Sequence, residues 1–550
     1  MSNPIALLSL TIFLPAIGAL LLVAFDKKAE EAMKNFTFFI TMATFGLTVA
    51  IYSQFDPSVA AMQMQVSVPW IPSWNINYQL GVDGISLTLV LLTAFVFVIS
   101  ALASWSIKDK VKGYLILFLI LETGVLGVFF ALDFFLFYVF WEVMLLPMYF
   151  LIGIWGGPRK EYAAIKFFLY TLFGGVLMLI AMLIFYFNSA QSDISQHQNI
   201  FDLLKLAQIA EAGQFSRGMQ IVAFWLLLIG FAIKLPSFPV HTWLPDAHVE
   251  APTPISMILA GILLKLGGYG IIRIAMPLCP YGMQYAAYAL VAIGTFSIIY
   301  GALAAMAQTD FKRLVAYSSV SHMGYVLIGL AVWKINEATG ATVGEQYWRL
   351  GLSGAMFQML AHGVSSAGMF FMVGVVYDRV HHRDLNRFGG LMQKMPQYSA
   401  LAFVIFFAGL GLPGLCGFIG EAFVVLSMWN FSPLLAVIAA FGVILTAGYI
   451  LWTLQRVYMG PEYKGPHPED LHEMNGREAT VAWIVSAFAI LLGILPYSML
   501  GLMEPSIGHL TQNLSVGYSK LHEAPPAVSS LLESAHQELM ATEQPLVSER

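Results

Sequence analysis

Fourteen apolar segments follow one another along this chain, each close to the length of a membrane-crossing helix. A crossing helix needs about 20 mostly apolar residues. Of the 550 residues, 58% are hydrophobic and only 11% are charged, whereas a soluble domain carries about 25% charged residues. Backbone groups in lipid must be hydrogen-bonded within their own segment, so we predict an all-α polytopic membrane protein. The predicted spans cover residues 5–25, 36–54, 86–106, 113–131, 134–154, 161–187, 219–245, 253–275, 284–306, 313–333, 349–377, 399–429, 433–455 and 480–503.

Two pairs of short motifs recur at nearly the same distance. Leu-Pro occurs at residues 235–236 and 412–413, 177 residues apart, and Tyr-x-Leu-Ile-Gly begins at Tyr149 and at Tyr325, 176 residues apart. Two matches at nearly one offset indicate a duplicated unit. Proline inside a helix removes a hydrogen bond and clashes with the preceding turn, so each Leu-Pro predicts a broken helix. Such breaks in both halves of a transporter point to its ion or substrate pathway.

The offset also predicts the organisation of the chain. Each repeat contains five spans, an odd number, so its two copies must have opposite orientations in the membrane. We expect little regular structure in the acidic, proline-containing tail. The predicted parts are residues 1–112 (spans 1–3), 113–275 (first repeat, spans 4–8), 284–459 (second, inverted repeat, spans 9–13), 480–503 (span 14) and 504–550 (polar C-terminal tail).

Loop charge predicts the orientation of the spans. With the N-terminus outside, 17 of the 27 lysines and arginines fall in inner loops and 7 in outer loops, as the positive-inside rule requires. The outer stretch at residues 55–84 contains neither residue type. We therefore expect both termini on the outer side. The amphipathic segment at residues 200–212 falls in an outer loop and is expected to lie along the membrane face.

Residue types argue against several functional classes. Nucleic-acid binding is not expected, because the lysines and arginines form only short loop clusters. Cys279 and Cys416 are the only cysteines, and they lack the Cys-x-x-Cys spacing of a zinc ribbon or a cysteine-ligated cluster. The histidines and acids at residues 241–250 have metal-like spacing, but they occupy a proline-rich stretch at a span end, and we do not interpret them as a metal site. We expect no metal or other cofactor on this chain.

Ionisable side chains inside the predicted spans are the main functional signal. Each costs roughly 2.5–3.5 kcal/mol at mid-span unless it is paired or hydrated, and chains keep such residues mostly for function. We interpret the set as candidate proton carriers. The candidates are Glu142 in span 5, Lys234 just before the first break, Lys265 in span 8, His322 in span 10, His362 in span 11 and Glu421 after the second break.

The chemistry of these residues suits proton transfer. Burial disfavours the charged form of a lysine and a nearby carboxylate favours it, so a Glu142–Lys234 pair would hold or release a proton depending on whether it is closed. Histidines titrate near neutral pH and can relay between lysine and glutamate. The repeat places Glu142 and His322 four residues apart in register, on the same helix face.

Structural explanations stay open for single residues. Any one glutamate or lysine could form an ion pair that only joins helices, and His322 and His362 could be packing histidines. The roles of Glu122, central in span 4, and Lys166, near an end of span 6, also stay open, since Lys166 could extend its ammonium to the interface. A structural origin for the whole ladder is the weaker explanation, because every member carries the cost of burial.

Four motifs resemble one known family. Residues 234–254 read Lys-Leu-Pro-Ser-Phe-Pro-Val-His-Thr-Trp-Leu-Pro-Asp-Ala-His-Val-Glu-Ala-Pro-Thr-Pro, and they closely resemble the antiporter-like, proton-translocating subunits of respiratory complex I, the NADH–quinone oxidoreductase. Residues 81–87 (Gly-Val-Asp-Gly-Ile-Ser-Leu), 141–148 (Trp-Glu-Val-Met-Leu-Leu-Pro-Met) and 261–270 (Gly-Ile-Leu-Leu-Lys-Leu-Gly-Gly-Tyr-Gly) are similar to its chain M branch, the counterpart of mitochondrial subunit 4. The resemblance covers almost the entire chain.

The resemblance implies a fold and a set of roles. The family has fourteen spans with two inverted five-helix repeats, in agreement with the count above. Glu142 and Lys234 would match the glutamate–lysine pair of the half-channel, and Lys265 would match the central lysine. Glu421 would match the exit-side residue, which is glutamate in this branch and usually lysine in the sister chains. His322 and His362 would lie on the connecting polar axis.

The resemblance also implies partners and a location. FMN, iron–sulfur clusters and the quinone site would belong to partner subunits, and the partners would be the other complex I membrane-arm subunits, including two further antiporter-like chains. The location would be a bacterial inner membrane with both termini periplasmic. Two alternatives share the same glutamates and lysines: a subunit of a multi-subunit sodium/proton antiporter and a subunit of a membrane-bound hydrogenase. A non-pumping scaffold would not need the ladder.

Overall fold

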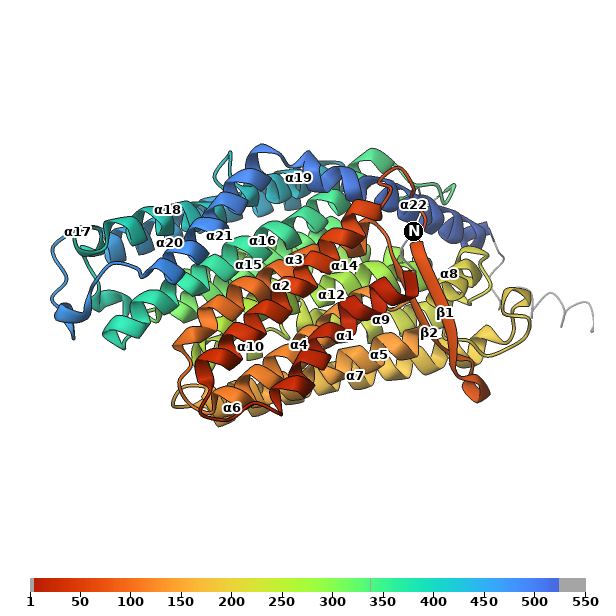
Figure 1. Ribbon diagram of the computed structural model, residues 1–550. Coiled ribbons are helices and arrows are strands. Elements are labelled where there is room, and N and C mark those ends of the chain that lie inside the picture. The colour runs from red at the N-terminus through yellow and green to blue at the C-terminus, as the bar shows by residue number, and fades with distance from the viewer. Residues whose placement is uncertain (1–3, 337, 524–550) are drawn as a thin grey trace, which may run out of the picture.

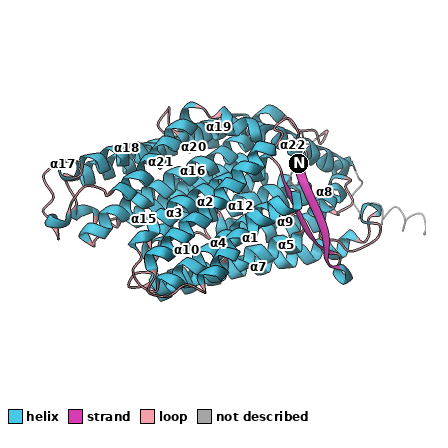
Figure 2. Cartoon of the chain, viewed as in Figure 1, coloured by secondary structure: helices cyan, strands magenta, loops and turns pink. Residues whose placement is uncertain are grey.

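Helices make up nearly all the regular structure of the computed structural model, which describes residues 4–336 and 338–523 (Figure 1, Figure 2). They run roughly parallel to one another along the long dimension of the molecule. The N-terminal part contains α1 (Pro4–Leu22), α2 (Glu30–Gln54), β1 (Gln63–Ile71), β2 (Ile76–Val82) and α3 (Gly84–Ala103). The next part contains α4 (Val111–Phe130), α5 (Phe134–Val143), α6 (Leu145–Trp155), α7 (Lys160–Ser189), α8 (Leu203–Glu211), α9 (Arg217–Lys234), α10 (Trp243–Glu250), α11 (Thr253–Ile258), α12 (Leu264–Gly270) and α13 (Met276–Leu278).

The second half begins with two long helices that pack against each other and ends with a helix along one end of the bundle (Figure 1). Its elements are α14 (Pro280–Met306), α15 (Phe311–Ala331), α16 (Glu345–Val380), α17 (Leu391–Lys394), α18 (Pro396–Leu410), α19 (Cys416–Phe431), α20 (Pro433–Tyr458), α21 (Gly476–Ile494) and α22 (Tyr497–Glu523).

The predicted spans are found in order. Thirteen helices or continuous helix groups of the described chain are long and apolar enough to cross a membrane. The remaining predicted span, residues 399–429, is the pair of shorter apolar helices α18 and α19. The prediction of an all-α protein with about fourteen spans is therefore confirmed, and one two-stranded antiparallel hairpin, β1–β2, is added to it.

Both predicted helix breaks are present. The first separates α9 from α10, and the second separates α18 from α19. Neighbouring groups take over backbone hydrogen bonds at the first break: Trp243 Nε1 donates to the Ile233 carbonyl at 2.8 Å, and Ser297 Oγ accepts from the Phe238 N–H at 3.1 Å. The chain runs in opposite directions through the two breaks (Figure 1), which is the arrangement that inverted repeats predict.

The hairpin, α8 and α22 lie together at one end of the bundle, near the start of α1 (Figure 1). The amphipathic segment at residues 200–212 forms α8 and buries Leu203, Leu206 and Ile209. The expectation of little regular structure after Met503 is wrong for residues 504–523, because α22 continues through them and packs against α3 and α16. The rest of the predicted tail lies outside the described residues.

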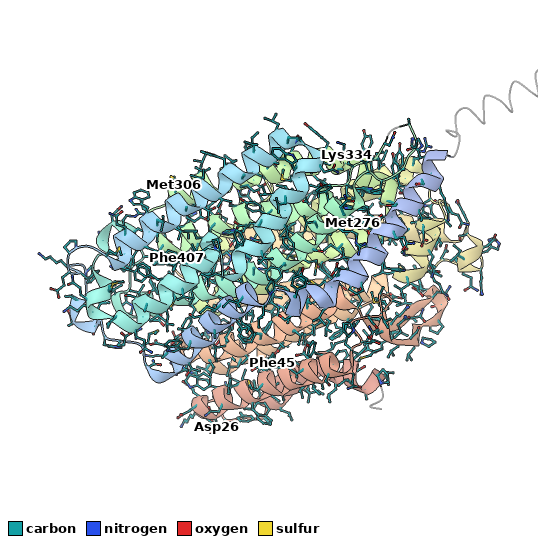
Figure 3. All side chains as sticks on the ribbon, turned by 90° about the horizontal axis from the view of Figure 1, so that it is seen from above. Asp26, Phe45, Met276, Met306, Lys334 and Phe407 are labelled. Carbon is teal, nitrogen blue, oxygen red and sulfur yellow. The ribbon has the colours of Figure 1, made fainter. Side chains whose placement is uncertain are left out.

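The central layer consists of α11 to α13, α15 and α16, whose side chains are almost completely buried. Side chains fill the space between the helices (Figure 3), and Met306 and Lys334, which flank α15 in sequence, lie far apart along its length. The outer helices α2, α7 and α20 instead expose many apolar side chains, including Phe39, Leu169 and Ile444. This distribution suits a bundle whose surface faces lipid.

One pair of glycines lets α7 and α9 approach each other closely. A Cβ on Gly230 in α9 would lie 2.7 Å from the Gly174 carbonyl in α7, closer than atoms tolerate. We expect Gly230→Ala to cost about 1–3 kcal/mol through overpacking and to lower the melting temperature of the purified protein in detergent. Gly46→Ala, whose Cβ would meet nothing within 4 Å, should stabilise the helix by up to about 1 kcal/mol. Equal melting temperatures for the two variants would contradict the close approach.

Candidate functional site

Lys265 lies at the centre of the structure and is fully buried. It belongs to α12, which sits between two π-helical turns at residues 259–263 and 271–275. Such turns shift the register of a helix and are frequent at functional sites. The Lys265 ammonium donates to the carbonyl of Ala260, which lies in the first π-turn, and contacts His362 Nδ1 at 2.7 Å. The central lysine and one predicted histidine are therefore in direct contact.

A second hydrogen-bonded group continues from His362. The ring of His322, on α15, lies 5.7 Å from the ring of His362, on α16. His322 Nδ1 lies 2.8 Å from Glu421 Oε1 on α19, and Gln358 Nε2 donates to the same oxygen at 3.3 Å. All four side chains are buried. The Nε2 atoms of both histidines have no hydrogen-bond partner among the described residues.

Glu421 joins this group to the second helix break. Its Oε2 lies beside Gly411, where a Cβ would be only 2.8 Å from it. Gly411 has a φ of +81°, a left-handed conformation that glycine adopts without steric cost. Residues 412–414 of the break are exposed, while Glu421 is buried. The carboxylate thus links a buried histidine to a backbone segment that reaches the surface.

The first half of the ladder is built differently. Lys234 is the last residue of α9, and its ammonium lies 5.4 Å from the ring centres of both Trp141 and Phe167. Aromatic faces stabilise a cation at such distances. Glu142 lies at the end of α5, with the Tyr138 hydroxyl beside its carboxylate. Lys234 and Glu142 are close enough to interact electrostatically, but the described structure has no direct ion pair between them.

A glycine allows the two halves to approach each other. A Cβ on Gly267 in α12 would collide with the backbone of Phe231 and Leu235, at the end of α9. The helix that carries Lys234 therefore packs directly against the helix that carries Lys265. Within the described residues, no hydrogen bond connects the two lysines. The structure thus brings together four of the six predicted residues in one contiguous group and places the other two as a neighbouring pair.

Two buried polar residues were missed by the sequence analysis. Gln358 bridges His322 and Glu421, and it lies one helical turn before His362, which was the available signal. Lys312 was assigned to an inner loop, yet it is buried at the start of α15 and donates to the Ala251 carbonyl at 2.6 Å. His248, which the sequence analysis considered only for its metal-like spacing, stacks on Phe370 at 4.2 Å, and neither of its ring nitrogens has a partner among the described residues.

Lys166 and Glu122, whose roles the sequence left open, lie in different environments. Lys166 pairs with Asp246 at 2.7 Å, and Arg313 approaches the same carboxylate at 3.4 Å, so Lys166 belongs to a half-buried ion cluster and does not only extend to the interface. Glu122 is fully buried, and within the described residues neither of its oxygens has a hydrogen-bond partner.

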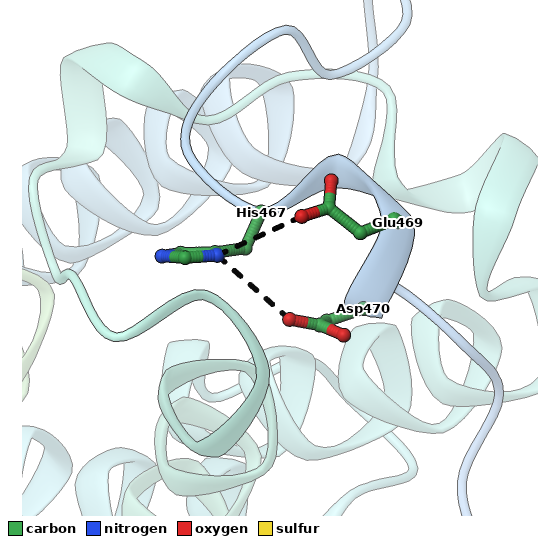
Figure 4. Close-up of side chains that lie close together, drawn as sticks. All are labelled: His467, Glu469 and Asp470. Atoms are coloured by element: carbon green, nitrogen blue, oxygen red, sulfur yellow. Dashed lines mark ion pairs between the residues drawn. The ribbon is translucent and has the colours of Figure 1, made fainter.

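The residues with metal-like spacing at 241–250 do not form a ligand set in the described structure, because they contact different partners. In the described chain, three ligand-type side chains converge only at His467, Glu469 and Asp470 (Figure 4). This group lies on an exposed loop, with His467 Nδ1 3.7 Å and 3.8 Å from the two carboxylates. Exposed acidic groups of this kind are common on protein surfaces.

Burial shifts the pKa of Asp133, a carboxyl group that lies just outside the spans. Asp133 begins α5, where its side chain accepts hydrogen bonds from the Leu136 and Asn77 N–H groups at 3.0 Å. Burial raises the pKa of Asp133 to about 6, although these hydrogen bonds oppose the shift. The end of the helix that carries Glu142 is therefore held by a carboxyl group that titrates close to physiological pH.

Comparison with known proteins gives matches over most of the chain. The model of a family described as "NADH:quinone oxidoreductase/Mrp antiporter, TM" matches residues 131–446. NADH-quinone oxidoreductase subunit M of Rhodobacter capsulatus is 39% identical over 94% of this chain and 99% of its own length.

Solved structures have the same fold. A chain of respiratory complex I from Thermus thermophilus with bound NADH matches with a TM-score of 0.80 and 28% identity, over 92% of this chain and 99% of that chain. A chain of the Mrp complex from Dietzia sp. DQ12-45-1b matches with a TM-score of 0.79 over 95% of this chain and 100% of that chain. At 21% identity, the second match is evidence for the fold alone.

Proposed function

This chain belongs to the NADH:quinone oxidoreductase/Mrp antiporter family of membrane proteins, and we propose that it is a proton-translocating membrane-arm subunit of an NADH:quinone oxidoreductase. In that enzyme it couples electron transfer from NADH to quinone, carried out elsewhere in the complex, to proton movement across the membrane. The 39% identity with a subunit M over almost the full length of both chains supports this assignment.

The observation that carries the proposal is the contiguous group Lys265, His362, His322 and Glu421. A proton on the Lys265 ammonium can move to the neutral His362 Nδ1, with which it is already in contact. Transfer between the two rings then protonates His322, whose Nδ1–H can donate to Glu421. Each carrier gains the proton that the previous one loses, so no other reactant is required. Glu421 can release the proton at the second break.

Glu142 and Lys234 are proposed as the control point of the first half. The rings of Trp141 and Phe167 stabilise the protonated Lys234, and the charge on Glu142 adds to that stabilisation. Movement of Glu142 toward Lys234 would favour the protonated lysine, and movement away would favour proton release. In this proposal, the open geometry of the described structure, without a direct ion pair between Glu142 and Lys234, is assigned to the releasing state.

We infer that the electron carriers lie on partner subunits. FMN, iron–sulfur clusters and the quinone site are assigned to them, and the two other antiporter-like chains are proposed as membrane-arm neighbours. We further propose that the protein resides in a bacterial inner membrane with both termini on the periplasmic side. The distribution of lysine and arginine supports this orientation. The start of α1 and α22 lie at one end of the bundle, which agrees with both being on the same side.

The antiporter and hydrogenase alternatives are less well supported. A subunit of a multi-subunit sodium/proton antiporter would have the same fold, since the matched chain of the Mrp complex has this fold. Its identity of 21% is, however, well below the 39% shared with the NADH-quinone oxidoreductase subunit. Co-purification of NADH-oxidising flavoprotein subunits with this chain from its native membrane would be expected only for the proposed function.

The role of Glu142 can be tested in the complete enzyme. Glu142→Gln should reduce proton pumping and coupled NADH:quinone turnover by at least about tenfold, on the scale of losing a positioned acid–base group. NADH:ferricyanide activity should be unchanged, because it needs only peripheral subunits. Glu122→Gln is a matched control: it removes another buried carboxyl group in the neighbouring α4, for which no electrostatic partner is found among the described groups. Equal losses in both variants would contradict a specific role for Glu142.

We expect the losses of pumping caused by changing Glu142 and Lys234 to be non-additive. Lys234→Ala should be as damaging as Glu142→Gln, and the double variant should be no worse than either, because residues that act as one unit give non-additive losses. The measurement is pumping in proteoliposomes, normalised to the amount of assembled complex. Additive losses would show that the two residues act independently.

Two variants of Glu421 distinguish a proton carrier from a structural partner, because the two roles predict opposite orders of damage. If it carries a proton, Glu421→Gln should block pumping, because the amide cannot exchange a proton, and Glu421→Lys should retain part of it. If it is only a structural partner of His322, the amide should be tolerated and the charge reversal beside His322 should disrupt assembly. Pumping and assembly of both variants in proteoliposomes distinguish these cases. Normal pumping by Glu421→Gln would remove this residue from the pathway.

A further inference from the structure

One arginine at the end of α20 has no ion-pair partner among the described residues. Arg456 lies in the last turn of this helix and stacks on Trp452, with its guanidinium carbon 3.8 Å from the centre of the ring. Its Nε and Nη2 atoms are buried and have no hydrogen-bond partner within the described chain. Asp384 interacts with it only at longer range and pairs with Arg387 at 3.4 Å. Buried N–H groups without an acceptor are costly, so an acceptor from outside the chain would stabilise this guanidinium.

The guanidinium borders a surface cavity of about 430 Å³. The cavity lies between the end of α20 and the loop that joins α16 to α17, at the end of the bundle opposite to the β1–β2 hairpin (Figure 1). Asn386, Gln455 and Arg456 provide polar side chains, and Phe388 and Trp452 provide aromatic ones. No acidic residue is among the described residues that line it. The cavity therefore carries one positive charge and no negative charge.

The position of the cavity along α20 indicates the depth of lipid head groups. The side chains of Phe441, Ile444 and Leu451 are more than half exposed on this helix and form an apolar surface of the kind that faces lipid. This surface ends at Trp452 and Arg456, one turn apart, and tryptophan is enriched where a membrane meets water. The cavity thus adjoins both an apolar surface and a charged loop, at the proposed inner end of the bundle.

We propose that this cavity binds the head group of an anionic phospholipid, whose phosphate accepts hydrogen bonds from Arg456. A guanidinium presents its N–H groups in a planar fork that matches the oxygens of a phosphate. The side-chain amides of Asn386 and Gln455, both exposed, can donate further hydrogen bonds. The acyl chains would lie along the exposed side chains of Leu451 and Ile444.

The charges around the cavity select the kind of phospholipid. A zwitterionic head group carries an ammonium beside its phosphate, and no carboxylate lines the cavity to receive it. A neighbouring cavity of about 680 Å³ adds Arg387 and Lys464. The acid that lines the neighbouring cavity, Glu462, already pairs with Lys394 at 2.8 Å. An anionic head group is therefore attracted to this place, whereas an ammonium would be repelled.

An arginine near a helix end can also extend to the interface without binding a particular lipid. That explanation predicts equal contact of the cavity with anionic and zwitterionic lipids, whereas a binding site predicts selective contact with the anionic one. Arg477 provides a matched control, because its guanidinium also lies over a tryptophan ring, 5.5 Å from the centre of Trp105. It lines a cavity that contains Asp378 and Glu478, so its charge is already balanced.

The test uses the assembled membrane complex that contains this chain, reconstituted into phosphatidylcholine liposomes. A small, equal fraction of a photoactivatable lipid is added, either phosphatidylglycerol or phosphatidylcholine, with the diazirine in the acyl chain close to the head group. After illumination, labelled peptides are identified by mass spectrometry, and their yield is normalised to the amount of assembled complex. We expect phosphatidylglycerol to label residues 451–461, which border the cavity, several-fold more than phosphatidylcholine does.

Variants show whether the labelling depends on the stacked guanidinium. Arg456→Gln should reduce labelling by phosphatidylglycerol about tenfold, the scale of one hydrogen bond to a charged group, and Arg477→Gln should leave it unchanged. Equal labelling by the two lipids in the wild type would overturn the proposal. So would an equal loss in the two variants, or an absence of labelling because a neighbouring subunit covers the cavity.

If Arg456→Gln does not assemble, Trp452→Leu replaces it. This variant keeps an apolar side chain and removes the ring on which the guanidinium stacks. A loss of labelling by phosphatidylglycerol would support the site, and unchanged labelling would overturn it.

Soluble glycerol phosphate separates a lipid site from a site for free phosphate esters. Added in excess during illumination, it should not reduce the labelling, because it lacks the acyl chains that lie along α20. Full competition would assign the cavity to a soluble phosphate ester and overturn the lipid proposal. The labelling is measured without NADH, so its outcome does not depend on whether this chain carries protons.

Discussion

The cost of placing charge in an apolar interior governs this structure. An ionisable group at mid-membrane depth is retained only where other groups meet its hydrogen-bonding and electrostatic needs. In the group that contains Lys265, these needs are met by direct contacts, from Lys265 to His362 and from His322 to Glu421. Lys234 instead lies near two aromatic rings, with Glu142 at longer range. The first group is therefore held by direct hydrogen bonds, whereas Lys234 and Glu142 are not bonded to each other in the described structure.

Backbone irregularities are what bring these side chains to the centre. The break after Lys234 ends α9 against Gly267 of α12, so the absence of a side chain at that glycine lets the two lysine-bearing helices meet. Ala260, in the π-turn before α12, provides the carbonyl that accepts from Lys265. At the second break, the left-handed Gly411 leaves room for the Glu421 carboxylate. Regular helices would provide neither the acceptors nor the space.

The sequence was sufficient for the spans and both breaks, because apolar length and proline are local signals. It also located six ionisable residues inside the spans, whose roles as proton carriers stay predictions. It was not sufficient for contacts between helices. Lys265 and His362 are 97 residues apart in sequence, and their contact depends on the rotation of two helices, which residue spacing does not reveal. Lys312 looked like a loop residue because it lies at a span end, and α22 was missed because its polar residues suggested a tail. The opposite orientation of the two repeats stays a prediction that the direction of the chain through the breaks supports.

A buried lysine can pass a proton only to a neighbouring group that can accept it. His362 Nδ1 contacts the Lys265 ammonium directly, and a neutral imidazole nitrogen can accept a proton. Arg273, two turns further along the same helix, pairs with Asp83, and a permanently charged arginine cannot accept one. The side of Lys265 toward which the proposed transfer runs therefore follows from which nearby groups can change their charge.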